Sequence, residues 1–138
     1  MNASAHTPAA KKRVVAGWVL TALVALFLTF DTVLKVLQLP AAVQGTTELG
    51  YPAHTVLWIG LIELVCLAAY LAPPTSVLGA LLLTGYLGGA IATHVRVGNP
   101  LFGYVLFPIY VAVLLWGGLY LREPRLKELL PFRRPART

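Results

Sequence analysis

The feature that most constrains this chain is the scarcity of charge between Val14 and Leu121. Lysine, arginine, aspartate and glutamate occur there at only five positions, namely Asp31, Lys35, Glu48, Glu63 and Arg96. Over the whole chain of 138 residues, 58% are hydrophobic and 12% are charged, whereas about 25% are charged in a typical soluble domain. This composition argues against a water-soluble globule, and against a disordered chain, which lacks apolar surface to bury. It indicates a small integral membrane protein with room for one domain.

Four apolar windows divide this region, and each is close to the roughly 20 residues needed to cross ~30 Å of hydrocarbon. The predicted helices cover residues 14–39, 53–72, 75–97 and 101–121. Pro40, Pro73-Pro74 and Gly98-Asn99-Pro100 mark their boundaries, because proline and glycine interrupt helices. Pro108 predicts a kink in the last helix. The sequence therefore predicts an all-α membrane protein, an antiparallel bundle of four transmembrane helices over residues 14–121.

Basic residues gather outside the apolar region. Nine of the eleven lysines and arginines lie in residues 1–13 and 122–138. Because lysine and arginine beside membrane spans stay in the cytoplasm, both termini are predicted to be cytoplasmic. The second tail also carries Leu126, Leu129 and Leu130, whose spacing predicts a short helix on the membrane surface. The basic excess is attributed to lipid contact, so no nucleic-acid partner is expected. A cleaved signal peptide is a weaker alternative, because the first apolar run is longer than such peptides need.

Four ionisable side chains are predicted to meet in the outer half of the bundle. Counted at 1.5 Å per residue from the outer helix ends, Asp31 and Glu63 both lie about 12–13 Å deep. Lys35 and His94 lie about 5–6 Å below the same surface. Ionisable groups within a span face the bundle interior or a water-filled cavity. We therefore expect a polar pocket that opens outward.

These side chains keep two interpretations each. Asp31 and Lys35 are four residues apart on one helix face, so they either neutralise one another or contact a ligand. Glu63 has no partner in its own helix and should face inward. There it either has a structural role, protonated and hydrogen-bonded or paired with Lys35 or His94, or exchanges protons with a substrate. Tyr110 is predicted at the depth of Glu63, where its phenol either donates to a carboxylate or a flat lipophilic ligand or simply fills the core.

Metal and thiol chemistry find little support in the sequence. A haem held by His54 and His94 has little support, because two histidines near helix ends occur readily by chance. A zinc ion held by His94, Glu63 and Asp31 would lack the usual ligand spacing, so no metal is predicted. Cys66 is the single cysteine, which rules out an intrachain disulfide and a CxxC thiol relay.

The helix predicted at residues 75–97 is rich in small residues. Gly85, Gly88 and Gly89 give it a face on which a second helix backbone can approach closely. We expect this face to pack against another helix of the same bundle, with a homo-oligomer contact as the alternative.

Several segments together resemble a known family. They are Leu34-Lys35, Gly60-Leu61-Ile62-Glu63-Leu64, Pro73-Pro74, Thr84-Gly85-Tyr86-Leu87-Gly88-Gly89-Ala90 and His94-Val95-Arg96-Val97-Gly98-Asn99-Pro100. Their combination resembles the DoxX-like family of bacterial four-helix membrane proteins, over nearly all of residues 14–130. That family takes its name from a subunit of an archaeal thiosulfate:quinone oxidoreductase. The resemblance implies a multi-pass protein of the bacterial cytoplasmic (inner) membrane, associated with redox systems but without an assigned reaction.

Three hypotheses of function follow from these residues and the resemblance. In the first, the pocket binds a quinone-like or other small lipophilic molecule, and the chain is either not an enzyme alone or a subunit of a quinone-linked oxidoreductase. In the second, the chain is a small proton-coupled transporter that uses Glu63 as its proton carrier. In the third, it is a noncatalytic assembly or scaffold subunit that contacts other membrane subunits. A quinone is the single cofactor suggested, and the lipid bilayer is the partner common to all three.

Overall fold

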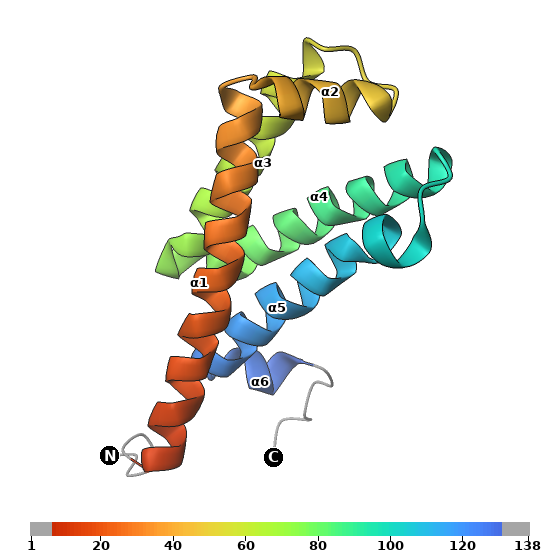
Figure 1. Cartoon of the computed structure of the whole chain (residues 1–138). Helices are drawn as coiled ribbons and strands as arrows, with labels where there is room; N and C mark the ends of the chain where they lie inside the picture. Colours follow the sequence, from red (N-terminus) through yellow and green to blue (C-terminus); the bar gives the residue numbers. More distant parts are fainter. Residues whose placement is uncertain (1–6, 131–138) are drawn as a thin grey trace.

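The computed structural model describes residues 7–130, and no β-strand occurs among them. The helices are α1 (Pro8–Val36), α2 (Pro40–Glu48), α3 (Thr55–Leu71), α4 (Ser76–Arg96), α5 (Phe107–Arg122) and α6 (Leu126–Leu129). A 3-10 turn at Pro73–Thr75 joins α3 to α4, and a π-helical turn at Leu101–Val105 precedes α5. The chain runs away from its N-terminus along α1, returns along α3, and repeats this path along α4 and α5 (Figure 1). The expectation of an all-α helical bundle is confirmed.

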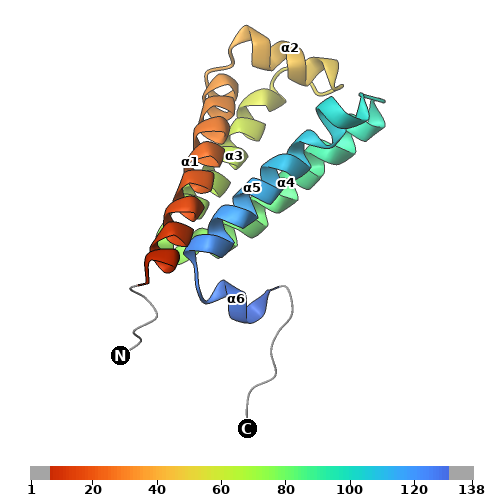
Figure 2. The same ribbon diagram turned by 60° about the horizontal axis from the view of Figure 1, so that its bottom comes forward.

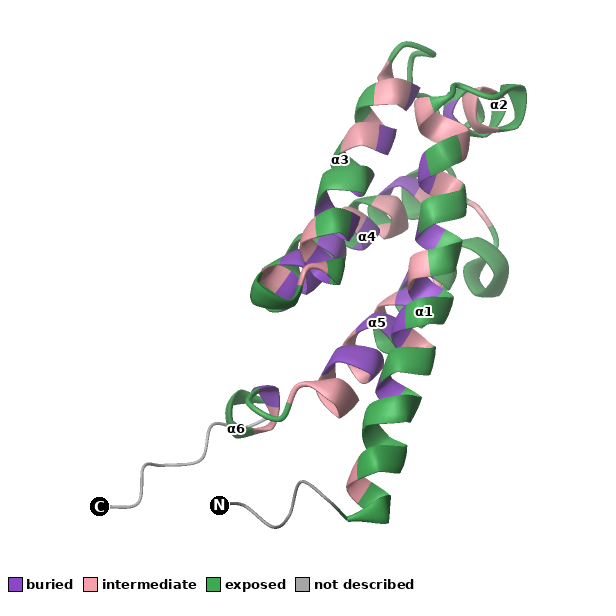
Figure 3. Cartoon of the chain, turned by 90° about the vertical axis from the view of Figure 1, so that its left-hand side faces the viewer, coloured by how far each residue is buried: buried purple, intermediate pink, exposed green. Residues whose placement is uncertain are grey.

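Within residues 7–130, three helical segments are long and apolar enough to cross a membrane. They are Pro8–Val36, Pro73–Arg96 and Leu101–Arg122. The fourth, α3, is apolar but has 17 residues, which gives a length of about 25 Å. Large apolar side chains cover the outward faces of all four helices, while buried positions form stripes that face the neighbouring helices (Figure 3). Apolar side chains on the outside are what a lipid environment requires, so this is a multi-pass membrane protein.

Helix α1 is shifted toward the N-terminus relative to the predicted span of residues 14–39. It begins at Pro8, after the Thr7 hydroxyl, which accepts a hydrogen bond from the Ala10 amide at 3.4 Å. It ends at Val36, before Gln38 turns the chain with a φ of 51°. The prediction missed the start because residues 8–13 lack large apolar side chains and end in three basic residues, and such a segment can be helical when it begins with a good cap.

The segment expected to be an outer loop contains α2. Pro40 was expected to end the first helix, but it occupies the first turn of a new one. Proline suits that position because its missing N–H has no acceptor there and its φ is already helical. Helix α2 lies across the ends of α1 and α3 (Figure 1), and this placement makes it part of the site described below.

Pro108 lies in the first turn of α5 rather than at a kink inside a longer helix. The break precedes it, between the π-helical turn and Phe107. This interruption changes the direction in which the later side chains of α5 point, relative to a continuous helix starting at residue 101.

Close backbone contacts hold the bundle together at the end where α1 begins and α5 finishes. A Cβ placed on Gly17 would lie 2.8 Å from the Gly118 carbonyl oxygen, and one on Gly118 would lie 2.8 Å from the Thr21 hydroxyl. Gly79 of α4 lies directly against the backbone of Tyr70 in α3. We call this region the closed end. Glycine is needed at these contacts because any side chain would separate the helices.

The helices separate toward the opposite end. Helix α1 stays beside α3, and α4 stays beside α5, but the two pairs diverge on approaching α2 (Figures 1 and 2). The apolar core fills the bundle from the closed end to its middle; it includes Val24, Leu28, Leu67, Tyr70, Leu83, Leu115 and Leu119. Beyond this core, the space between the pairs forms a cavity.

Candidate functional site

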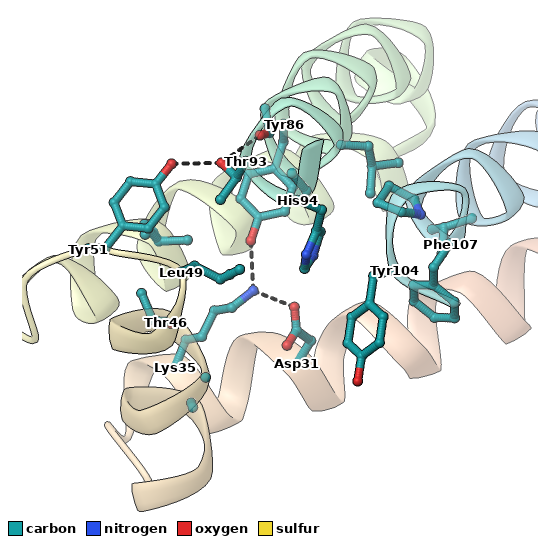
Figure 4. Close-up of a pocket in the computed structure, with 18 of the residues that line it drawn as sticks. Asp31, Lys35, Thr46, Leu49, Tyr51, Tyr86, Thr93, His94, Tyr104 and Phe107 are labelled. Atoms are coloured by element: carbon teal, nitrogen blue, oxygen red, sulfur yellow. Dashed lines mark hydrogen bonds and ion pairs between the residues drawn. The ribbon is translucent and has the colours of Figure 1, made fainter. Parts of the chain in front are cut away.

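The cavity has a volume of about 760 Å³ and lies between the two helix pairs, beneath α2. Most of its wall is apolar or aromatic, and its ionisable lining residues are Asp31, Lys35, Glu48, Tyr51, Tyr86, His94 and Tyr104. Figure 4 shows Lys35 with its ammonium group between the side chains of Tyr86 and Asp31. Small-molecule sites commonly have this size and this mixture of an apolar wall with a few polar groups.

Lys35 is the centre of the polar groups. Its Nζ donates to Glu63 Oε2 at 3.0 Å and to the Tyr86 hydroxyl at 2.7 Å, and it forms an ion pair with Asp31 Oδ2. A lysine ammonium has three N–H groups, so these three acceptors use all of them. We call Asp31, Lys35, Glu63 and Tyr86 the polar cluster. Of the two partners considered for Glu63, Lys35 and His94, the structure pairs it with Lys35.

Glu63 is the most enclosed member of the polar cluster, with 0% of its surface exposed. Its Oε2 also accepts a hydrogen bond from the Tyr86 hydroxyl at 2.9 Å. Its Oε1 is buried and has no hydrogen-bond partner among residues 7–130. The carboxyl therefore faces inward, as predicted, and lies behind Lys35 and Tyr86 rather than on the cavity wall.

Gly60 explains how α1 and α3 bring Lys35 and Glu63 together. A Cβ on Gly60 would lie 2.7 Å from the Lys35 Cβ and 3.1 Å from the Val36 amide nitrogen. Any larger residue would push α1 away from α3. Glu63 is three residues further along α3 and so lies on the same helix face, which aims its carboxyl at Lys35.

Asp31 connects the polar cluster to the cavity. It is one turn before Lys35 on α1, and 35% of its side chain is exposed, compared with 15% for Lys35. Among the described residues, Oδ2 is the one oxygen of this carboxylate that takes part in a hydrogen bond. The other oxygen is available to a molecule in the cavity.

His94 lines the cavity but does not join the polar cluster. Its Nδ1 is 2.8 Å from the side-chain nitrogen of Asn99, and its ring lies 5.8 Å from the ring of Tyr104. The alternative in which Glu63 pairs with His94 is therefore wrong in this structure. Within residues 7–130, no group of three or more histidine, cysteine, aspartate or glutamate side chains is placed to hold a metal ion.

Tyr110 was predicted to line the pocket, and this prediction is wrong. It does not border the cavity, and 46% of its surface is exposed on the outside of α5. The depth calculation gave its height along the helix, but height does not determine which way a side chain faces. The break before Phe107 removed the continuous helix that the calculation assumed.

Tyr86 takes the role proposed for Tyr110, and the sequence contained a signal for it. Tyr86, Ala90 and Thr93 are spaced by four and three residues on α4, so they share one helix face, and all three line the cavity. His94 follows on the same side. A stripe of polar and small residues on an otherwise apolar helix would have identified Tyr86 as a cavity residue.

The three glycines expected to pack against a helix of the same bundle do not do so. A Cβ on Gly85, Gly88 or Gly89 would meet no atom within 4 Å. Gly85 and Gly89 instead line the cavity, while Gly88 does not. Without side chains at these two positions, α4 leaves the cavity wide.

Two contacts fix α2 and the loop after it over the cavity. The Tyr51 and Thr93 hydroxyls are 2.8 Å apart, and the Arg96 guanidinium donates to the Leu49 carbonyl oxygen at 2.5 Å. Both contacts join the segment after α2 to α4, across the gap between the helix pairs. Arg96 thus binds a loop carbonyl at the outer end of α4.

The fold and the site define a small multi-pass helical membrane protein with an ion-paired cluster at the wall of an internal cavity. The chain belongs to the DoxX-like family, whose match covers residues 19–118. All four members of the polar cluster fall inside the matched region. No curated protein and no solved structure matches the chain.

Proposed function

We propose that this DoxX-like protein binds a small lipophilic molecule that has one polar end. The observation that carries the proposal is the position of the polar cluster at the wall of a large, mainly apolar cavity. Keeping charged groups inside a membrane protein is costly, and such groups commonly mark a binding or transport pathway. The polar end of the ligand contacts Asp31 and its apolar body lies against Phe27, Ile59 and Phe107.

The proposed orientation places the cavity opening on the outer side of the membrane. Lys11, Lys12 and Arg13 lie in the first turns of α1, at the closed end, where Arg122 ends α5. If basic residues beside spans stay in the cytoplasm, the closed end faces inward. Both termini are then cytoplasmic, α3 completes a fourth span, and α2 lies on the outer side of a bacterial inner membrane.

A quinone is the ligand that the family resemblance suggests, and the cavity suits its size better than its chemistry. The aromatic wall offers flat surfaces to a ring. However, the N–H groups of Lys35 and the O–H group of Tyr86 are already bonded within the polar cluster. A quinone carbonyl could accept a hydrogen bond from them only by displacing one of their present acceptors, which are Asp31, Glu63 and the Tyr86 hydroxyl.

The test uses two glycines that are neighbours in sequence but differ in position. In Gly89→Leu the new side chain enters the cavity, whereas in Gly88→Leu it extends from the same helix away from it. Neither substitution meets an atom within 4 Å at Cβ, so both variants should fold. Lipophilic molecules retained by the gently extracted protein are identified by mass spectrometry. We expect wild type and Gly88→Leu to retain the same compound and Gly89→Leu to lose it; equal retention by all three would refute the proposal.

A second candidate, a proton-coupled transporter, is favoured by one specific observation. Glu63 is fully buried, and its Oε1 has no partner within residues 7–130. A buried carboxyl oxygen that has no hydrogen-bond partner can take up a proton without losing an existing hydrogen bond. In sealed vesicles, Glu63→Gln should abolish substrate uptake driven by a proton gradient, and unchanged uptake would eliminate this candidate.

A further inference from the structure

We propose that the cavity selects a lipophilic cation: a molecule with an apolar, preferably aromatic, body and a protonated amine that binds Asp31. This inference rests on the proposed function and specifies the class of its ligand. It follows from which hydrogen-bonding groups of the polar cluster remain free, from the balance of charge, and from the side chains around Asp31.

The donors of the polar cluster are fully used. Lys35 directs its three N–H groups to Asp31, Glu63 and Tyr86. Tyr86 has one hydroxyl hydrogen, and it donates to Glu63 at 2.9 Å. A ligand that brings only an acceptor, such as a ketone or a carboxylate, therefore finds no free donor in the polar cluster.

One hydrogen-bond acceptor of the polar cluster remains free beside the cavity. The second carboxylate oxygen of Asp31 forms no hydrogen bond with any described residue, and this side chain borders the cavity. A ligand that donates a hydrogen bond can use this oxygen without breaking any existing contact. A hydrogen bond between an ionised donor and an ionised acceptor is roughly twice as strong as a neutral one.

The balance of charge favours the same class of ligand. The polar cluster contains two carboxyl groups, Asp31 and Glu63, and a single ammonium group, Lys35. Glu48 adds a third carboxyl at the cavity wall, where it accepts a hydrogen bond from Gln44 at 2.9 Å. The nearby guanidinium of Arg96 is bound to the Leu49 carbonyl and does not line the cavity. A cationic ligand brings the lining closer to neutrality.

Aromatic rings line the same cavity as Asp31. Figure 4 shows Tyr104, on the π-helical turn, and Phe107, the first residue of α5, facing the segment of α1 that carries Asp31. The Phe27 and Phe107 rings are in edge contact with their centroids 5.3 Å apart, and both line the cavity. Aromatic faces attract organic cations, so these rings suit both the body and the charged end of the ligand.

The experiment compares three compounds that share one naphthyl body. Naphthylmethylamine carries a cation that donates hydrogen bonds, naphthylmethanol carries a neutral hydroxyl, and acetylnaphthalene carries a carbonyl that only accepts. Binding to the purified full chain in lipid nanodiscs is followed by the fluorescence of the naphthyl group. We expect the amine to bind about tenfold more tightly than acetylnaphthalene, with the alcohol between them.

Substitutions at Asp31 test whether this carboxylate causes the preference. Asp31→Asn should remove the tenfold advantage of the amine, and Asp31→Glu should retain most of it. Lys35 keeps Glu63 and Tyr86 as acceptors in both variants, so both should fold. Tyr110→Phe should leave the preference unchanged, because Tyr110 does not border the cavity and is exposed on the outside of α5.

The outcomes separate this inference from the proposed function. If all three compounds bind, Gly89→Leu weakens them all, and the amine has no advantage, then the cation inference is wrong and lipophile binding stands. An amine preference that survives Asp31→Asn would also overturn the inference. If none of the compounds binds, or if Gly89→Leu has no effect on any, both proposals fail.

Discussion

At the closed end of the bundle the helices touch through their backbones, whereas at the end beneath α2 they enclose an open cavity. Both ends contain glycines, but Gly17, Gly79 and Gly118 are in close contact with other helices, while Gly85 and Gly89 face empty space. In one place the missing side chain allows packing, and in the other it leaves room for a ligand. The same residue type thus has opposite consequences, depending on whether a partner helix faces it.

The two ends also differ in how they bind a partly buried cation. At the closed end the Arg122 guanidinium lies 4.5 Å from the Trp18 ring centroid and 5.4 Å from that of Tyr70, and its Nε donates to Thr21 at 3.1 Å. Beside the cavity Lys35 is bound by two carboxyl groups and a phenol. Aromatic rings and a helix C-terminus suffice for a cation near the membrane surface. An ammonium group held by two acidic residues is the costlier arrangement, which is consistent with a functional role.

The largest effect is expected from removing the cation of the polar cluster. Lys35→Met leaves the buried carboxyl of Glu63 without its ion-pair partner, which should destabilise the protein by about 4 kcal/mol. Thermal unfolding in detergent measures the loss. The double variant Lys35→Met/Glu63→Leu should recover most of it, because no buried carboxyl then remains unpaired; if the double variant is no more stable than the single one, the ion pair is not the cause.

A slightly smaller effect is expected at the closed end. Gly79→Leu would force α4 away from the backbone of Tyr70, and overpacking of this kind should destabilise the fold by about 3 kcal/mol. Gly85→Leu, on the same helix but facing the cavity, is the matched control and should change the stability little. Equal losses of stability in the two variants would show that Gly85 is packed as tightly as Gly79, which would contradict the difference between the two ends of α4.

Removing the phenol that joins Lys35 to Glu63 should have an intermediate effect. Tyr86→Phe loses the hydrogen bonds at 2.7 Å and 2.9 Å to these two side chains, which should lower the free energy of unfolding by about 1.5 kcal/mol. Tyr110→Phe is the control, because that hydroxyl lies on the exposed side of α5. A larger effect from Tyr110→Phe would contradict the assignment of Tyr86 to the site.

The smallest effect is expected where α2 and its following loop are fastened to α4. Tyr51→Phe removes the 2.8 Å hydrogen bond to Thr93, and single bonds of this kind in membrane proteins contribute about 0.6 kcal/mol. Thermal unfolding should therefore change little. Hydrogen exchange of the α2 amides should nevertheless become faster in this variant, whereas exchange of the closed-end amides should not.

The sequence predicted those features that depend on local composition. Apolar windows located the helices. The charge of Glu63 inside one of them required this side chain to face inward and to have a partner, and that partner is Lys35. What failed depended on how the helices are arranged in space. The short helix α2, the outward direction of Tyr110 and the empty space beside Gly85 all follow from breaks and divergence of helices, and spacing along the chain does not record them. The inward direction of Glu63 followed from its charge, but nothing in the spacing gave the outward direction of Tyr110.

The central claim is that Lys35 and Glu63 form an ion pair in the interior of the folded protein, and solid-state NMR in lipid bilayers tests it most directly. With lysine side chains labelled with ¹⁵N and glutamate carboxyls labelled with ¹³C, the Nζ to Oε2 separation of 3.0 Å puts the labelled nitrogen close enough to the carboxyl carbon for a measurable dipolar coupling between these two side chains. The coupling should disappear in Lys35→Met and persist in Asp31→Asn. A wild-type spectrum without any lysine–glutamate coupling that depends on Lys35 would contradict the account.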